Sequence, residues 1–294
     1  MSVYSHSRIS SFENCPLQYR YRYIDQIRCG VEGVEAFVGK LVHEVLESLY
    51  ADLPRAREAG AAEYVSRFEA LWTERLSPAV RVVRSGMTLE DYRALGARCI
   101  ESFHRRHHPF EGGEVLGREL EVEFSLDTEG RYRMRGFIDR VDRVAPGILE
   151  IHDYKTGVLP RAGALRNDRQ LTLYEIAVRE QFEGVKEVRQ VWHYLAHDRE
   201  FDQMRTADDL RRTRVSAIRA IQRIEDTVDF PPRASALCSW CEYQGICPEW
   251  TQKMPAAGAG VTTPPEGLPL PVPIPTPAFE ARSGQYLLFG APGR

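Results

Sequence analysis

Apolar residues in the first hundred positions recur at the three- and four-residue spacing of amphipathic helices. This spacing predicts helices in residues 10–24, 37–50, 63–76 and 88–108. Pro16 is able to start a second helix within the first segment, because proline is favoured at the first helical position. Cys99 lies on the apolar stripe of the last segment and is predicted to be a buried core thiol. The N-terminal region is therefore expected to be helical.

The pattern changes at Glu119, where residues 119–126 (ELEVEFSL) alternate strictly between polar and apolar side chains. Strict alternation predicts a half-buried strand. The same reading predicts further strands and helices, with strands in 132–144, 148–156 and 187–197 and helices in 167–182 and 208–226. Asn167 or Asp168 is expected to cap the first of these helices. Strands interleaved with helices favour an α/β fold, with a mixed sheet flanked by helices.

Proline dominates the chain from Met254 onward, as in PPEGLPLPVPIPTP. Proline removes backbone donors and favours extended, solvated chain. Residues 254–280 are therefore expected to be a disordered linker, and residues 281–294 a separate short segment. One folded domain is expected in residues 1–253, with a helical insert at about 51–115.

The formal net charge is −3, so any contact with nucleic acid must come from local basic surface. Candidate surfaces are Arg20 with Arg22, and the arginines of residues 205–223, although a solvated helix face explains the latter equally well. No apolar run approaches the ~20 residues of a membrane span. The first residues lack the apolar core of a signal peptide, so a cytoplasmic location without membrane contact is expected.

Two aspartates and a lysine form the most informative cluster. The Ala-Pro-Gly loop centred on Pro146 predicts a hairpin in which the residue numbers of each pair add up to 292. Asp139 and Asp153 satisfy that sum, so they are expected to face each other. Lys155 lies on the same face as Asp153, whereas Asp142 lies on the opposite pleat from Asp139. Opposed like charges are destabilising, and a divalent cation would offset the repulsion. The alternative is a surface salt-bridge ladder without chemistry.

Asp139, Asp153 and Lys155, in this order, resemble the PD-(D/E)XK nuclease superfamily. The surrounding GFIDRVD and HDYKTG resemble its RecB-like, AddB-like exonuclease branch. Two further motifs of that branch are present: G-x-x-x-H in GKLVH, which ends at His43, and Q-x-x-x-Y in QLTLY, which starts at Gln170. The resemblance covers roughly residues 1–250 and implies a restriction-endonuclease-like core.

The resemblance also implies roles for these residues. The ligands of Mg²⁺ or Mn²⁺ would be His43, Asp139, Asp153 and the backbone carbonyl of Tyr154. Lys155 would stabilise charge at the scissile phosphate or hold the attacking water. Gln170 and Tyr174, four residues apart on one helix face, would help to position DNA and the lysine. An ordinary amphipathic helix with Tyr174 in the core is the alternative.

Six cysteines are present, and three of them form a C-x-x-C-x5-C run at Cys238, Cys241 and Cys247. Clustered thiolates usually bind a metal or an iron–sulfur cluster. One N-terminal and three C-terminal cysteines around the nuclease motifs resemble the [4Fe–4S] centre of AddB-type nucleases, which makes Cys15 the fourth ligand. Zn²⁺ bound by the same thiolates, or unligated thiols, are the alternatives.

These observations predict a metal-dependent DNA nuclease, and family analogy favours an exonuclease acting on ends with single-stranded character, in repair or recombination. The alternatives are a CRISPR-associated adaptation nuclease and a non-catalytic DNA-binding scaffold subunit. The chain has no G-x-x-x-x-G-K-[ST] loop, so any helicase would be a partner.

The last residues contain a second candidate interaction motif. Gln285, Leu288 and Phe289 resemble the Q-x-x-L-F pattern by which bacterial proteins bind the sliding clamp. A docking peptide on a flexible linker would raise the local concentration of a nuclease at DNA ends. A tail that folds back onto the domain, or simple disorder, is the alternative.

Overall fold

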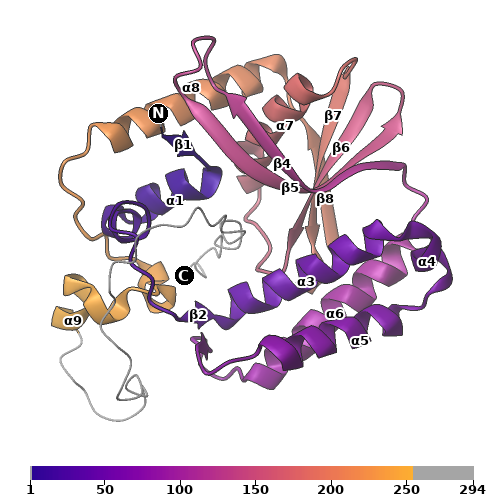
Figure 1. The fold of residues 1–294 in the computed structure, drawn as a ribbon, viewed down its shortest axis with the longest axis horizontal. Coiled ribbons are helices and arrows are strands. Elements are labelled where there is room, and N and C mark those ends of the chain that lie inside the picture. The colour runs from indigo at the N-terminus through magenta and orange to yellow at the C-terminus, as the bar shows by residue number, and fades with distance from the viewer. Residues whose placement is uncertain (1, 254–294) are drawn as a thin grey trace.

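A six-stranded mixed sheet forms the centre of the protein (Figure 1). Its strands are β1 (Val3–Tyr4), β4 (Glu114–Ser125), β5 (Arg133–Ala145), β6 (Ile148–Lys155), β7 (Glu187–Tyr194) and β8 (Arg199–Met204). Their order is β1-β5-β6-β7-β8, with β4 also paired to β5. The structure, a computed structural model, describes residues 2–253. The predicted linker and the motif at Gln285, Leu288 and Phe289 lie outside the described residues and stay predictions.

The β5–β6 hairpin has the predicted register. Its pairs run from Arg143↔Leu149 to Arg140↔His152, and each of these sums to 292. The turn at Pro146 and Gly147 depends on glycine, since Gly147 has a φ of +79°. Asp139 and Asp153 lie one step beyond the last paired residues, where the two strands begin to separate.

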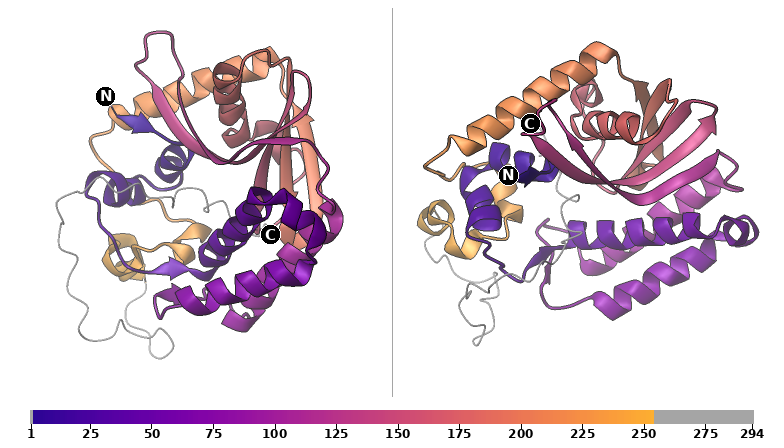
Figure 2. Two further views of the ribbon diagram at one scale, coloured as in Figure 1. Left: turned by 45° about the vertical axis from the view of Figure 1, so that its right-hand side comes forward. Right: turned by 45° about the horizontal axis from the view of Figure 1, so that its top comes forward.

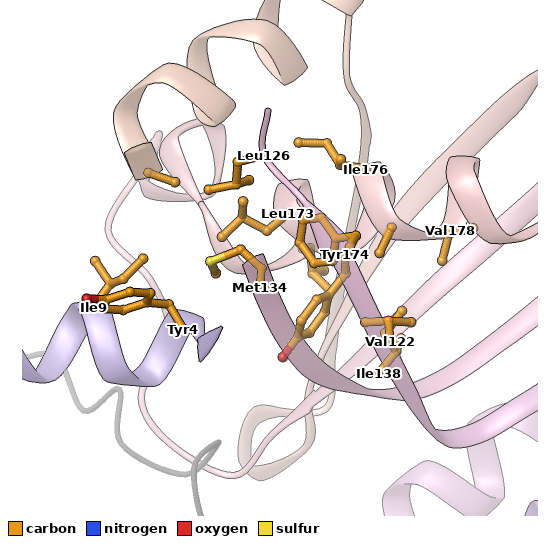
Figure 3. Packing of buried hydrophobic residues seen from close by; sticks show 14 of the residues in the cluster. Tyr4, Ile9, Val122, Leu126, Met134, Ile138, Leu173, Tyr174, Ile176 and Val178 are labelled. Carbon is orange, nitrogen blue, oxygen red and sulfur yellow. The ribbon is translucent and has the colours of Figure 1, made fainter. Parts of the chain in front are cut away.

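Two layers of helices cover the two faces of the sheet (Figure 2). Helices α7 (Gln170–Gln181) and α8 (Ala207–Glu225) pack on one face, with a core that Figure 3 shows in part. Helices α3 (Val34–Ala51), α5 (Ala61–Arg75) and α6 (Leu89–His107) form the other layer, with the short α4 (Leu53–Glu58) between α3 and α5. Cys99 is fully buried in this second core, as predicted.

The N-terminal helices lie beside the last described residues (Figures 1 and 2). Helix α1 (His6–Asn14) is followed by α2 (Pro16–Tyr19), which starts at the predicted proline, and by a π-helical turn at Arg20–Ile24. Opposite them lie the 3-10 turns Ala236–Trp240 and Gln244–Ile246 and helix α9 (Pro248–Lys253). Arg22 pairs with Glu242 at 2.6 Å, and the Tyr21 hydroxyl donates to Ile246 O at 3.3 Å. The two ends of the described chain are thus joined directly.

Short elements complete the described chain. β2 (Glu32–Gly33) pairs with β3 (Val80–Arg81), and two further 3-10 turns cover Ala164–Asn167 and Leu195–His197. Strand β8 was not predicted, and the predicted strand 187–197 ends at Tyr194. No helix in residues 2–253 is both long and apolar enough to span a bilayer.

The predicted basic surfaces are mostly neutralised. Arg20 pairs with Asp25, while Arg211 and Arg212 pair with acids in the first turn of their own helix, α8. Ion pairs between neighbours on one exposed helix are what a solvated helix face contains, but exposed pairs are weak and leave these arginines accessible.

Candidate active site

Lys155 and Asp153 form an ion pair at the end of β6. The Lys155 Nζ lies 2.9 Å from Asp153 Oδ1 and 2.8 Å from Oδ2. Asp153 is 4% exposed, so this pair is not a surface salt bridge. A buried carboxylate that holds a lysine in one place fixes a positive charge at a defined point, which an active site requires and a solvated ladder does not.

Asp139 lies beside this pair, at the point where β5 leaves its partner. Its Oδ2 accepts the backbone N–H of Tyr154 at 2.7 Å, and its Oδ1 lies 3.5 Å from His43 Nδ1. Asp139 is 6% exposed. Asp142, the competing carboxylate, pairs with Arg140 instead, at 3.0 Å. The structure therefore brings together Asp139, Asp153 and Lys155.

Helix α3 brings His43 to the same place. The His43 Nε2 lies 2.8 Å from the Tyr154 carbonyl oxygen and donates to it, which leaves Nδ1 facing Asp139. A histidine whose second nitrogen donates to a backbone carbonyl has its ring orientation and tautomer fixed, as metal-binding histidines commonly do. The Tyr154 carbonyl was expected to be a metal ligand, but in this arrangement it accepts the hydrogen bond of His43.

Glu119 is a site residue that the sequence did not reveal. Its Oε1 lies 4.0 Å from His43 Nδ1, and ligand atoms of Glu119, His43 and Asp139 all lie within 4.8 Å of one another. Glu119 has a φ of +41°, which is uncommon for a residue with a side chain. The strict alternation of ELEVEFSL placed Glu119 among solvent-facing acids. The flanking pairs Arg118↔Arg140 and Leu120↔Ile138 both sum to 258, so Glu119 lies opposite Asp139.

The pKa values of these buried groups are shifted in different directions. Burial, together with the charge of Asp139, outweighs Lys155 and raises the pKa of Asp153 to about 7. Burial would also raise the pKa of Asp139, but His43 and the Tyr154 N–H hold it below its usual value. Burial disfavours charge on His43, yet Asp139 raises the pKa of His43 to about 9. The pKa of Lys155 is raised despite burial, because Asp153 stabilises its charge.

The donor set fits a divalent cation. His43, Glu119 and Asp139 offer one imidazole nitrogen and two carboxylates around one point. Carboxylate oxygens suit Mg²⁺ and Mn²⁺, and an imidazole nitrogen favours the transition ion. A positive ion would also relieve the repulsion among three acids in one site.

The two residues of the Q-x-x-x-Y motif have different surroundings. Gln170, the first residue of α7, accepts a hydrogen bond from Lys155 Nζ through Oε1 at 3.2 Å. Tyr174 packs in the core on the α7 face of the sheet, close to Gly136 (Figure 3). A Cβ on Gly136 would lie 2.4 Å from Tyr174 Cε1. Gln170 thus contacts the candidate catalytic lysine directly, while Tyr174 packs against the strand that carries Asp139.

The four cysteines of the predicted cluster lie where the two chain ends meet. Cys15 Sγ accepts the Arg233 N–H at 3.4 Å, and Cys238 Sγ accepts the Ser235 N–H at 3.3 Å. All four are partly exposed, and none forms a disulfide. Within residues 2–253, no three of these sulfurs lie within 4.8 Å of one another, whereas a tetrahedral Zn²⁺ would place them about 3.8 Å apart. Amide groups that donate to sulfur suit thiolate ligands.

Comparison with known proteins identifies the family. Residues 3–248 match the family model of the PD-(D/E)XK nuclease superfamily, and no curated protein matches the sequence. The solved structure of SSO0001 is 14% identical, with a TM-score of 0.39, and the match covers 82% of this chain and 84% of that one. A protein described as a "putative exonuclease" from Eubacterium rectale is 12% identical, with a TM-score of 0.48 and coverage of 82% and 87%. The family model spans most of the chain, so this protein belongs to the PD-(D/E)XK nuclease superfamily.

Proposed function

We propose that the protein is a divalent-metal-dependent deoxyribonuclease of the RecB-like, AddB-like branch, acting as an exonuclease at DNA ends in repair or recombination. One observation carries the proposal. A buried ion pair fixes Lys155 beside Asp139, in a pocket of acids that His43 completes. A buried ion pair is costly to desolvate, and it often stabilises the fold no better than apolar residues of similar volume would. This cost argues against a catalytically silent scaffold.

Each side chain has a task in this mechanism. His43, Glu119 and Asp139 would hold Mg²⁺ or Mn²⁺, with Asp153 as a further carboxylate next to them. The bound ion would lower the pKa of a water molecule and neutralise charge on the scissile phosphate. Lys155 supplies a fixed positive charge toward the oxygens that become more negative. Gln170 accepts a second hydrogen bond from Lys155, so the ammonium group has little freedom to move.

DNA with single-stranded character is the proposed substrate, and a helicase that supplies such ends is a proposed partner. A CRISPR-associated adaptation nuclease is the runner-up, since it would use the same chemistry. Substrate topology separates exonuclease from endonuclease action, because a covalently closed circle offers no end.

The test uses end-labelled linear and circular DNA, single- and double-stranded, with Mg²⁺, Mn²⁺ or EDTA. Linear DNA should be degraded with either metal, and circles should survive. Lys155→Ala should lose at least about 100-fold in rate, as expected for loss of a fixed charge in a dry site. Lys186→Ala is the matched control, because Lys186 is exposed. Equal cleavage by wild type and Lys155→Ala would exclude the proposed active site, and cleavage of circles would exclude exonuclease action.

We also propose that Cys15, Cys238, Cys241 and Cys247 ligate a [4Fe–4S] cluster. The support is their convergence from both ends of the described chain and the amide donors to Cys15 and Cys238. Zn²⁺ bound by the same four thiolates is the alternative. The cluster would reinforce the contact between the N-terminal helices and the C-terminal turns that Arg22 and Glu242 already make.

A further inference from the structure

A second polar pocket lies on the opposite pleat of the strand that carries Asp153. It has a volume of about 320 Å³ and lies between the end of α6 and strands β5–β8. Its lining includes His107, Arg140, His152, His193 and Glu200. His152 directly precedes Asp153 along the chain, so the pocket and the candidate active site share strand β6 but face different sides.

Three side chains in this pocket converge from three separate elements. His107 is the last residue of α6, His193 lies on β7 and Glu200 on β8. Glu200 Oε2 lies 3.0 Å from His193 Nδ1 and 3.6 Å from His107 Nε2. Ligand atoms of all three lie within 4.8 Å of one another. Donor atoms around a tetrahedral Zn²⁺ are about 3.3 Å apart, so this spacing suits one ion with little rearrangement.

The hydrogen bonds of the neighbouring histidine leave a place for that ion. His152 Nδ1 lies 3.0 Å from His193 Nε2, and His152 Nε2 lies 3.3 Å from Asp142 Oδ2. Two neutral imidazoles carry only two N–H groups, but the row Asp142–His152–His193–Glu200 has three junctions. One junction of the row therefore lacks a proton, and within the described residues His152 Nε2 has no hydrogen-bond partner. A cation between His193 and Glu200 would take the place of one proton, so that the two N–H groups could serve the other two junctions.

His107 points to the same conclusion independently. Within the described residues, its Nε2 is buried and has no hydrogen-bond partner, although it faces Glu200 Oε2. Glu200 also differs from the other acids of the pocket. Asp142 pairs with Arg140, and Glu150 pairs with Arg189, whereas the ion-pair contacts of Glu200 within residues 2–253 are to histidines alone.

We propose that His107, His193 and Glu200 form a second metal site, which binds a divalent transition ion such as Zn²⁺ and ties helix α6 to strands β7 and β8. Two imidazoles and one carboxylate are ligands typical of Zn²⁺, with a fourth position left open to water from the pocket. His152 is the outer-shell partner that fixes the orientation of His193. The side chain of Glu200 is 37% exposed, so the ion can enter from solvent. This inference does not depend on the nuclease reaction.

Metal binding by the full-length protein tests the proposal. Wild type, Glu200→Gln, His107→Gln and the matched control Asp202→Asn are freed of labile metal with a chelator and then titrated with Zn²⁺ in excess Mg²⁺. Asp202 lines the same pocket from the same strand, but its contact is with Arg189. Glu200→Gln and His107→Gln should each bind one fewer Zn²⁺ per chain than wild type, while Asp202→Asn should match wild type. His152→Asn should weaken this site by about 10–100-fold.

Cobalt gives a second readout that separates this site from the cysteines. Co²⁺ in a site of nitrogen and oxygen ligands gives visible absorption without a thiolate charge-transfer band. This absorption should fall by the contribution of one site in Glu200→Gln, while the contribution of His43, Glu119 and Asp139 remains. Circular dichroism of the metal-free variants confirms that they fold. Equal Zn²⁺ stoichiometry and equal cobalt spectra in wild type and Glu200→Gln would overturn the proposal. That result would indicate that an additional proton, rather than a metal ion, lies between His193 and Glu200.

Discussion

The amide oxygen of Gln170 lies 3.2 Å from the Nζ of Lys155, on a different side from Asp153. Two acceptors from separate elements therefore fix the lysine, one from β6 and one from the first turn of α7. Removal of one acceptor leaves the charge in place but lets the ammonium group move. Gln170 is in this sense a positioning residue.

Gln170→Ala should accordingly lower kcat for DNA cleavage by about 10–100-fold, because displacement of a catalytic group by about 1 Å has such an effect. KM should change little, and Gln170→Glu should retain more activity than Gln170→Ala. Gln181→Ala, at the exposed end of the same helix, is the control. A rise in KM at unchanged kcat would show that Gln170 binds substrate rather than the lysine.

Gly136→Ala should destabilise the protein by about 1–3 kcal/mol, the usual cost of overpacking. The new methyl group would lie 2.4 Å from Tyr174 Cε1, and Tyr174 is 5% exposed and cannot move aside. Urea unfolding measures the effect. Gly112→Ala should be near neutral, since no atom lies within 4 Å of its Cβ position. If the clash with Tyr174 causes the loss of stability, Gly136→Ala should cost much less in a Tyr174→Leu background than in wild type. Additive losses in the double variant would exclude the clash as the cause.

Two substitutions of Asp139 should separate catalysis from stability. Asp139→Asn and Asp139→Ala should both abolish cleavage, because each removes a candidate metal ligand. Only Asp139→Ala should also lose about 1–3 kcal/mol of metal-free stability, since it leaves the buried N–H of Tyr154 without its acceptor. Thermal and urea unfolding in EDTA provide the comparison. Equal stability of the two variants would mean that the Tyr154 hydrogen bond has no energetic importance.

Cys15→Ser should yield colourless protein with less iron and a lower Tm, because loss of one ligand releases the contact between the two chain ends. Cys29→Ser, a partly exposed cysteine outside the run, should keep the colour of wild type. Iron content and visible absorbance are the measurements. Full iron occupancy in Cys15→Ser would remove this residue from the ligand set.

The contribution of His104 to the stability of the protein should fall as the pH falls below about 6.5, the ordinary pKa of histidine. Burial lowers the pKa of His104, which is 6% exposed and donates to the Ala59 carbonyl at 3.0 Å. Below pH 6.5, His104 therefore binds a proton in the unfolded chain but not in the folded state, which favours unfolding. Above pH 6.5, His104 is neutral in both states and has no such effect.

His104→Gln retains a donor for Ala59 but does not titrate. Relative to wild type, the free energy of unfolding of His104→Gln should be higher at pH 5.5 than at pH 8. A difference between the two proteins that is the same at both pH values would contradict this account of His104.

The hairpin and its acids could be predicted because short-range features determine them. The turn at Pro146 and Gly147, together with the register shift between Arg143 and Ala145, sets the register, and the register determines which carboxylates meet. Helix starts such as Pro16 follow from equally local chemistry. The family motifs then supplied His43, which no local pattern connects to Asp139.

Other features depend on long-range structure or on backbone irregularity. Glu119 enters the site because the pairing of β4 with β5 places it opposite Asp139, a long-range feature that alternation within one strand does not reveal. Strand β8 was not predicted because five of its six residues are exposed, so it has no apolar stripe. The row of groups from Asp142 to Glu200 joins four strands, and no spacing within one segment reveals it.

The pairing of β1 with the middle of the chain has a consequence for synthesis. Val3 pairs with Arg133 across the sheet, and Tyr21 and Arg22 bond to residues near 242–246. Helices α3, α5 and α6 pack mainly on one another and can assemble while the chain is still growing. Val3 and Tyr4 must instead wait until residues 133–134 have been made, and Tyr21 and Arg22 until residues 242–246 have been made, so this early segment completes its native contacts after those three helices can pack.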